Sequence, residues 1–267
     1  MKDKKRYDQK AMESLEPKWA AEIEYMLQHK FFFSSRWAAR KWGNRLFKEQ
    51  IKGSDRVCEC GCFLGIPSIF LSLTNPKVKI HSFDISPLSM LKSRQLCEKF
   101  SSGVNLFTAD FKALPFESNS FDWMFGFGVL HHCHYPETIG EIERTLSTGG
   151  KALFIEPQSL NPLIRMYRRI RREPYSSTER PYDHAMLGEL QRWAPGLEIS
   201  WTFEHFFSTF MVLIFTLFKK KRRNRRWISL YSKIQGIFGR LDDMLLTHFS
   251  GLRSFSQQVI ILMQKKG

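Results

Sequence analysis

The chain has 267 residues, a formal net charge of +15 and five cysteines. Its length suffices for one complete hydrophobic core with surplus chain, and the odd cysteine count, with three cysteines crowded at 58–62, argues against a disulfide framework and predicts a reducing compartment. No apolar run follows the first ten residues, so we expect no secretory signal. The excess positive charge calls for an anionic partner, either nucleic acid or a membrane surface.

The first predicted elements are two helices, at 17–29 and 35–47, within an N-terminal helical cap that we place at 1–50. These helices and the link between them are rich in aromatic residues, which bury large apolar areas. We expect them to help close the pocket in which the domain that follows would hold its substrate. The aromatic residues concerned are Trp19, Phe31, Phe32, Phe33, Trp37 and Trp42.

The most informative segment is RVCECGCFLG, at 56–65, where a short apolar strand carries an acid near its end and a glycine-punctuated turn opens a helix. This pattern is typical of a nucleotide-binding βα unit, in which the acid faces the ligand at the carboxyl end of the first strand. Glu59, Gly61 and Gly65 carry it here. Gly61, the first glycine, comes two residues after the acid Glu59, and this spacing differs from the dinucleotide-binding fingerprint.

Four further strands follow, and polar or small residues lie where each of them ends. An acid after the second strand can accept both hydroxyls of a ribose. A glycine pair, Gly149 and Gly150, turns the chain into the fifth strand. The residues at the strand ends are Asp84 and Ile85 after the second strand, Asp110 and Phe111 after the third, Gly126, Phe127, His131 and His132 at the fourth, and Glu156 at the fifth.

Together these elements, over about 57–157, resemble the class I S-adenosylmethionine-dependent methyltransferases of the small-molecule, ubiquinone and sterol type. The resemblance implies an α/β, Rossmann-like fold with a doubly wound seven-stranded sheet, and S-adenosyl-L-methionine as cofactor. It also implies that Asp110 meets the adenine amino group and Phe111 the adenine ring. The cofactor-binding residues it implies are Glu59, Gly61, Cys62, Gly65, Asp84, Ile85, Asp110, Phe111, Gly126 and Phe127.

The chain departs from this family at Phe63, where the family usually has the middle glycine of the turn. That glycine serves close backbone approach rather than a side-chain contact. We therefore expect Phe63 to narrow the cofactor turn without abolishing binding.

The histidines after the fourth strand are the candidate catalytic residues. In the family, the first histidine of such a pair lies beside the methyl group, so His131 or His132 could act as a base on an acceptor hydroxyl or amine. The alternative is that a histidine only supports the turn. The cluster HHCH at 131–134 does not predict a metal site, because side chains at adjacent positions point in different directions and few can converge on one ion. The cluster CxCxC at 58–62 does not predict one either, because its cysteines belong to a buried turn.

The remaining chain predicts an insertion in the methyltransferase core. Strands at 197–206 and 254–266 would be the sixth and seventh of the sheet, so we place the core at 51–205, continuing at 254–267. Nearly fifty residues separate strands that the family joins by a short loop, and a structureless loop of that length is improbable. Residues 206–253 are therefore predicted to form an inserted helical module.

This module combines three features of an interfacial anchor. An uncharged segment at 206–218 would form a helix of about 20 Å, too short to span a hydrocarbon core of about 30 Å. A basic cluster follows at 219–226, and apolar residues then recur at helical spacing from Trp227 to Phe249. The stripe could pack on the domain's own core, or it could lie on an anionic membrane surface.

The sequence thus predicts a cytoplasmic methyltransferase, peripherally attached to a membrane, that acts on a hydrophobic or lipid-linked acceptor. An RNA or DNA methyltransferase is the weaker alternative, because the nucleic-acid signatures are absent and the fourth strand ends GFGVL. A third interpretation is a non-enzymatic scaffold. The acids Glu59, Asp84 and Asp110 argue against it, because a scaffold needs no acids at ligand-facing strand ends. The sequence indicates neither the acceptor atom nor the oligomeric state.

Overall fold

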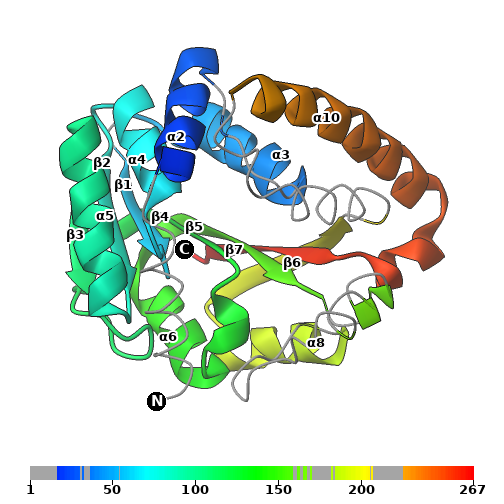
Figure 1. The fold of residues 1–267 in the computed structure, drawn as a ribbon. Helices are drawn as coiled ribbons and strands as arrows, with labels where there is room; N and C mark the ends of the chain where they lie inside the picture. The colour runs from blue at the N-terminus through cyan, green and yellow to red at the C-terminus, as the bar shows by residue number, and fades with distance from the viewer. Residues whose placement is uncertain are drawn as a thin grey trace.

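The structure is a computed structural model, which describes residues 17–30, 32, 37–53, 55–158, 161–162, 165–166, 169, 182, 184–204, 206 and 225–267. Its centre is a seven-stranded sheet in the order β3-β2-β1-β4-β5-β7-β6 (Figure 1). The strands are β1 (Arg56–Cys60), β2 (Lys79–Asp84), β3 (Asn105–Thr108), β4 (Phe121–Phe127), β5 (Leu146–Pro157), β6 (Leu197–Glu204) and β7 (Gln258–Lys265).

The strands from β3 to β5 run parallel, whereas β7 is antiparallel to both of its neighbours, β5 and β6. This arrangement confirms the predicted doubly wound sheet and the predicted pairing of the last two strands. The order reverses at β1, which lies between β2 and β4. In open α/β sheets, ligands bind in the crevice at such a reversal, outside the carboxyl ends of the strands.

Helices cover both faces of the sheet (Figure 1). Side chains of α2, α3, η1, α4, α5 and α10 contribute to the apolar cluster on one face, and those of α6 and α8 to the cluster on the other. Because both faces are covered, the central strand β1 is buried from Val57 to Cys60. The helices are α2 (Pro17–His29), α3 (Trp37–Arg45), η1 (Leu46–Gln50), α4 (Ile66–Thr74), α5 (Pro87–Phe100), η2 (Leu130–His132), α6 (Tyr135–Thr145), α8 (His184–Trp193), α10 (Arg225–His248) and η4 (Ser250–Phe255).

The long helix α10 is tied to α3 and β6 by polar contacts. The Lys41 ammonium on α3 lies 3.0 Å from Glu204 of β6 and 2.9 Å from Asp243 of α10. The indole of Trp42 donates a 2.6 Å hydrogen bond to Glu204. The pKa of Glu204 is nevertheless raised, chiefly because its carboxyl is buried. These contacts fix α10 across the top of the sheet in Figure 1.

Parts of the predicted additions lie outside the described residues. Of the apolar segment 206–218 only Phe206 is described, and of the basic run 219–226 only the last two residues. None of the helices in the described part of the chain combines the length and the apolar character needed to cross a bilayer. The division of the chain into cap, core and inserted module stays a prediction.

Candidate active site

The turn after β1 is built from alternating left-handed residues. Gly61, Phe63 and Gly65 have φ angles of 61°, 52° and 64°. The amide of Gly65 donates to the carbonyl of Cys62 at 2.8 Å, and the amide of Cys62 donates to Phe83 of β2 at 2.9 Å. The turn is therefore tightly wound and fastened to the neighbouring strand before α4 begins.

Gly61 is required for space as well as for its backbone angle. A Cβ on Gly61 would overlap the side chain of Val129, which comes from the loop after β4. A Cβ on Gly126 would also lie within 2.6 Å of Val129. Gly61 and Gly126, both predicted as cofactor residues, thus let the β4 loop approach the turn closely.

Phe63 joins the turn to Asp84 through its backbone. Its amide donates to one carboxylate oxygen of Asp84 at 2.9 Å, while the amide of Ser86 donates to the other oxygen at 3.0 Å. The carbonyl of Phe63 accepts a bond from the Ser93 hydroxyl at 3.0 Å. The carboxylate of Asp84 is consequently held in one orientation at the end of β2.

A cavity of about 390 Å³ opens beside this carboxylate, at the point where the strand order reverses. Its size suits a small organic ligand or cofactor. Of the residues predicted as cofactor-binding or catalytic, seven line it, namely Gly61, Asp84, Ile85, Asp110, Phe111, Phe127 and His132. Further lining residues, which sequence reasoning did not single out as ligand-facing, are Phe83, Lys112, Gly128, Val129, Cys133, His134 and Thr138.

The other predicted residues lie outside the cavity wall. Glu59 is buried and accepts a 3.2 Å hydrogen bond from the amide of Ser68 in the first turn of α4. Burial raises its pKa to about 8. Cys62 is a buried free thiol, Gly65 precedes the first residue of α4, and Gly126 lies within β4. Among the described residues, no group of His, Cys, Asp and Glu could hold a metal ion.

The buried carboxylate of Glu156 organises the loop after β4. One of its oxygens accepts from the amides of Val129 at 3.0 Å and Leu130 at 2.9 Å. The other accepts from the amide of His131 at 3.3 Å and lies 2.7 Å from Nδ1 of the same ring. Four donors from one loop thus meet one carboxylate. The sequence placed Glu156 at a strand end but gave it no role.

The two candidate histidines occupy different places. His131 is buried beneath the loop and held by Glu156, whereas His132 lines the cavity. Their ring centroids lie 3.9 Å apart. With Nδ1 of His131 donating to Glu156, the tautomer and orientation of the His131 ring are fixed. The ring of His132 packs against this fixed ring.

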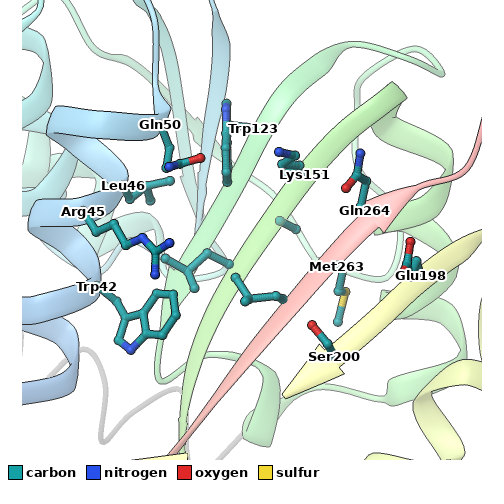
Figure 2. Close-up of a pocket in the computed structure, with 13 residues that line it drawn as sticks. Trp42, Arg45, Leu46, Gln50, Trp123, Lys151, Glu198, Ser200, Met263 and Gln264 are labelled. Atoms are coloured by element: carbon teal, nitrogen blue, oxygen red, sulfur yellow. The ribbon is translucent and has the colours of Figure 1, made fainter. Parts of the chain in front are cut away.

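A second cavity, of about 290 Å³, lies between α3, η1 and the sheet (Figure 2). Trp42 and Arg45 come from its helical wall, and Trp123 and Lys151 from the early parts of β4 and β5. None of the predicted site residues lines it. Because the carboxyl ends of the parallel strands do not open into this cavity, it is not the candidate active site.

Comparison with known proteins agrees with this geometry. Residues 58–154 match the family described as "Methyltransferase domain". The chain is 30% identical over 118 residues to demethylmenaquinone methyltransferase of Staphylococcus carnosus, covering 43% of the chain and 48% of that protein. It is also 30% identical over 99 residues to the human mitochondrial 2-methoxy-6-polyprenyl-1,4-benzoquinol methylase, covering 36% of the chain and 30% of that protein.

The fold has matching solved structures. Phosphoethanolamine N-methyltransferase 2 of Haemonchus contortus, in complex with S-adenosyl-L-methionine, superposes with a TM-score of 0.59 at 15% identity, covering 93% of this chain and 56% of that one. The chain contains, at 58–154, a segment that matches a methyltransferase domain. It spans less than half the length of these two curated relatives.

The residues of this methyltransferase domain fit S-adenosylmethionine, the cofactor of the class. Asp84, held by two backbone amides, would accept the ribose hydroxyls, and Asp110 would meet the adenine amino group. Ile85, Phe111 and Phe127 supply apolar walls. Glu59 joins β1 to α4 through the amide of Ser68, and its contact with the cofactor stays a prediction.

The left-handed conformation of Phe63 can be tested with a matched pair of variants. Phe63→Gly and Phe63→Ala both remove the phenyl ring, but only glycine adopts a φ of 52° without strain. We expect Phe63→Gly to be more stable than Phe63→Ala by about 1 kcal/mol in urea unfolding. In most positions the order is reversed, so an alanine variant equal to or above the glycine variant would contradict the account.

The role of Glu156 predicts a graded loss of stability. Glu156→Ala leaves three backbone amides and a ring nitrogen without their acceptor, which should cost about 3 kcal/mol or more. Glu156→Gln keeps one carbonyl oxygen for Val129 and Leu130 and should lose less. Chemical denaturation measures both, and an alanine variant as stable as the parent protein would refute the role.

Glu59 predicts a pH-dependent stability. Its pKa rises from 4.5 to about 8 on folding, so its protonated form favours the folded state. This contribution is complete below about pH 4.5 and is lost as pH rises toward 8. Glu59→Gln should therefore gain stability relative to the parent protein between pH 5 and roughly pH 8. Urea unfolding at several pH values tests this, with the exposed Glu198→Gln as control; a difference independent of pH would contradict it.

Proposed function

We propose that this protein is an S-adenosylmethionine-dependent methyltransferase that methylates a hydrophobic or lipid-linked acceptor at a membrane surface. One observation carries the proposal: a fixed carboxylate, a glycine turn and a histidine share a single cavity at the reversal of the strand order. The carboxylate is suited to a ribose, and the histidine is suited to proton transfer.

The acceptor class draws support from the relatives. Both curated relatives named above are quinone methyltransferases by their names. Phe63 and Phe83 add apolar, aromatic surface to the cavity wall beyond Phe111 and Phe127, which would contact the cofactor. We therefore propose an acceptor with an aromatic ring that carries an ionisable hydroxyl group and an apolar tail.

In this proposal the protein positions the acceptor and moves one proton. S-adenosylmethionine, when bound, supplies an electrophilic methyl group on a positively charged sulfur. His132 at the cavity wall takes the proton of the acceptor hydroxyl, which makes the ring or its oxygen a better nucleophile. His131, oriented by Glu156, acts as a positioning residue behind it. The apolar walls exclude water and align the acceptor for in-line transfer.

The experiment is a methyl-transfer assay with three acceptor classes. Radiolabelled S-adenosylmethionine is incubated with the full chain and a demethylated quinol in mixed micelles, phosphoethanolamine in solution, or transfer RNA. We expect label in the solvent-extractable quinol fraction. Label in the soluble amine or the RNA instead would reject the acceptor class, and no transfer to any of the three would reject the proposal as it stands.

The histidines give a matched comparison in the same assay. His132→Ala should lower the rate about 100-fold and remove the acid limb of its pH profile, because the proton acceptor is lost. His131→Asn retains a nitrogen donor for Glu156 and should keep most of the activity together with the acid limb. The opposite pattern, with His131→Asn inactive and His132→Ala active, would exchange the two roles.

A further inference from the structure

Helix α10 packs on the protein through a face that mixes apolar, polar and small residues: Ile228 and Tyr231 belong to the core cluster, and Trp227, Ile234 and Phe238 pack against it. The buried residues of this inner face recur at helical spacing and lie against α2, α3 and β6. Two glycines, Gly236 and Gly239, are buried with them. The other buried residues are Ile228, Tyr231, Ser232, Gln235, Asp242 and Leu246.

The opposite face of the same helix carries an exposed apolar stripe. Leu230, Ile237, Leu241 and Met244 are 57%, 60%, 39% and 53% exposed. Their spacings of seven, four and three residues place them on one line along the helix, about 21 Å long at 1.5 Å per residue. Phe249, just past the helix end, is also exposed. We call these four helical residues the outer stripe. Figure 1 shows α10 along the outer side of the molecule.

The charges of α10 are sorted between its two faces. Its two acids are Asp242 and Asp243. Asp242 is buried and accepts from the amide of Phe206 at 3.1 Å, and Asp243 pairs with Lys41. The exposed bases Arg226, Lys233 and Arg240 fall beside the outer stripe at helical spacing. The outward face of α10 therefore presents apolar side chains and positive charge together.

We propose that the outer stripe of α10 is a docking face for an anionic lipid bilayer. The four apolar side chains would enter the boundary between headgroups and acyl chains, while Arg226, Lys233 and Arg240 contact anionic headgroups. A second copy of the chain is a poorer occupant, because a two-fold contact through this face would bring its basic flanks together. The inference deepens the proposed function by naming the surface on which a lipid-linked acceptor would be met.

The test is vesicle flotation of the full chain and two sets of variants. The apolar set is Leu230→Gln, Ile237→Gln and Leu241→Gln combined. A matched control, Leu91→Gln, replaces a leucine of α5 that is 53% exposed. The charge set is Lys233→Gln with Arg240→Gln. Vesicles contain phosphatidylcholine alone or phosphatidylcholine with one-quarter phosphatidylglycerol.

We expect the parent protein and the control to float with anionic vesicles, and the apolar set to lose about 100-fold or more in affinity. The charge set should lose roughly 25-fold on anionic vesicles, about fivefold per charge, and less as salt rises. Unchanged binding by the apolar set would overturn the proposal, because it would assign binding to another segment. Absence of vesicle binding by the parent protein would overturn the proposal as well. The outer stripe would then have another occupant, such as a second copy of the chain or RNA.

Cofactor binding separates this proposal from the proposed function. Calorimetric titration with S-adenosylmethionine should give equal affinities for the parent protein and both variant sets, which also shows that the variants are folded. If flotation follows the outer stripe but no methyl transfer occurs, the docking face stands and the proposed activity falls. If transfer to micellar quinol occurs but the outer-stripe variants float like the parent protein, the proposed activity stands and the docking face falls.

Discussion

The candidate site depends on one buried carboxylate. Glu156 receives three backbone amides and a histidine nitrogen from the loop that follows β4. Because the loop is fixed in this way, the side chain of Val129 packs against Gly61 and Gly126, and His132 lines the cavity. The fifth strand thereby determines the shape of a wall whose other half comes from the first and second strands. A buried carboxylate of this kind is stabilising only when its acceptor capacity is filled, as it is here.

The turn on the other side of the cavity works under a different constraint. Gly61, Phe63 and Gly65 all need left-handed backbone, which strains only the phenylalanine. The amide of Phe63 nonetheless donates to Asp84, so the carboxylate keeps its support despite the missing glycine. Local strain at Phe63 is therefore compatible with a fixed Asp84 carboxylate.

Much of the fold and about half of the site could be predicted from the sequence, because these features are local in the chain. The strand that ends at Asp84 and the turn at Gly61 are short patterns of fixed geometry. The role of Glu156 could not be predicted, since its partners lie more than twenty residues earlier and meet it only across the sheet. The bond from the Ser68 amide to Glu59 could not be predicted either, because it depends on how α4 packs against β1; contact of Glu59 with the cofactor stays a prediction. Helix α10 illustrates a further limit. Its apolar arc from Trp227 to Phe249 is wide, so the sequence alone does not decide that Tyr231 is buried in the core cluster while Leu230 stays exposed.

The central claim is that Asp84, held by the turn, is the anchor of an S-adenosylmethionine site. The most direct measurement is calorimetric titration of S-adenosylmethionine into the parent protein and into Asp84→Ala. Loss of an acceptor for paired ribose hydroxyls should weaken binding by about 2 kcal/mol or more, roughly thirtyfold, without unfolding the domain. Equal affinities for the two proteins, or no binding by the parent protein, would contradict the claim.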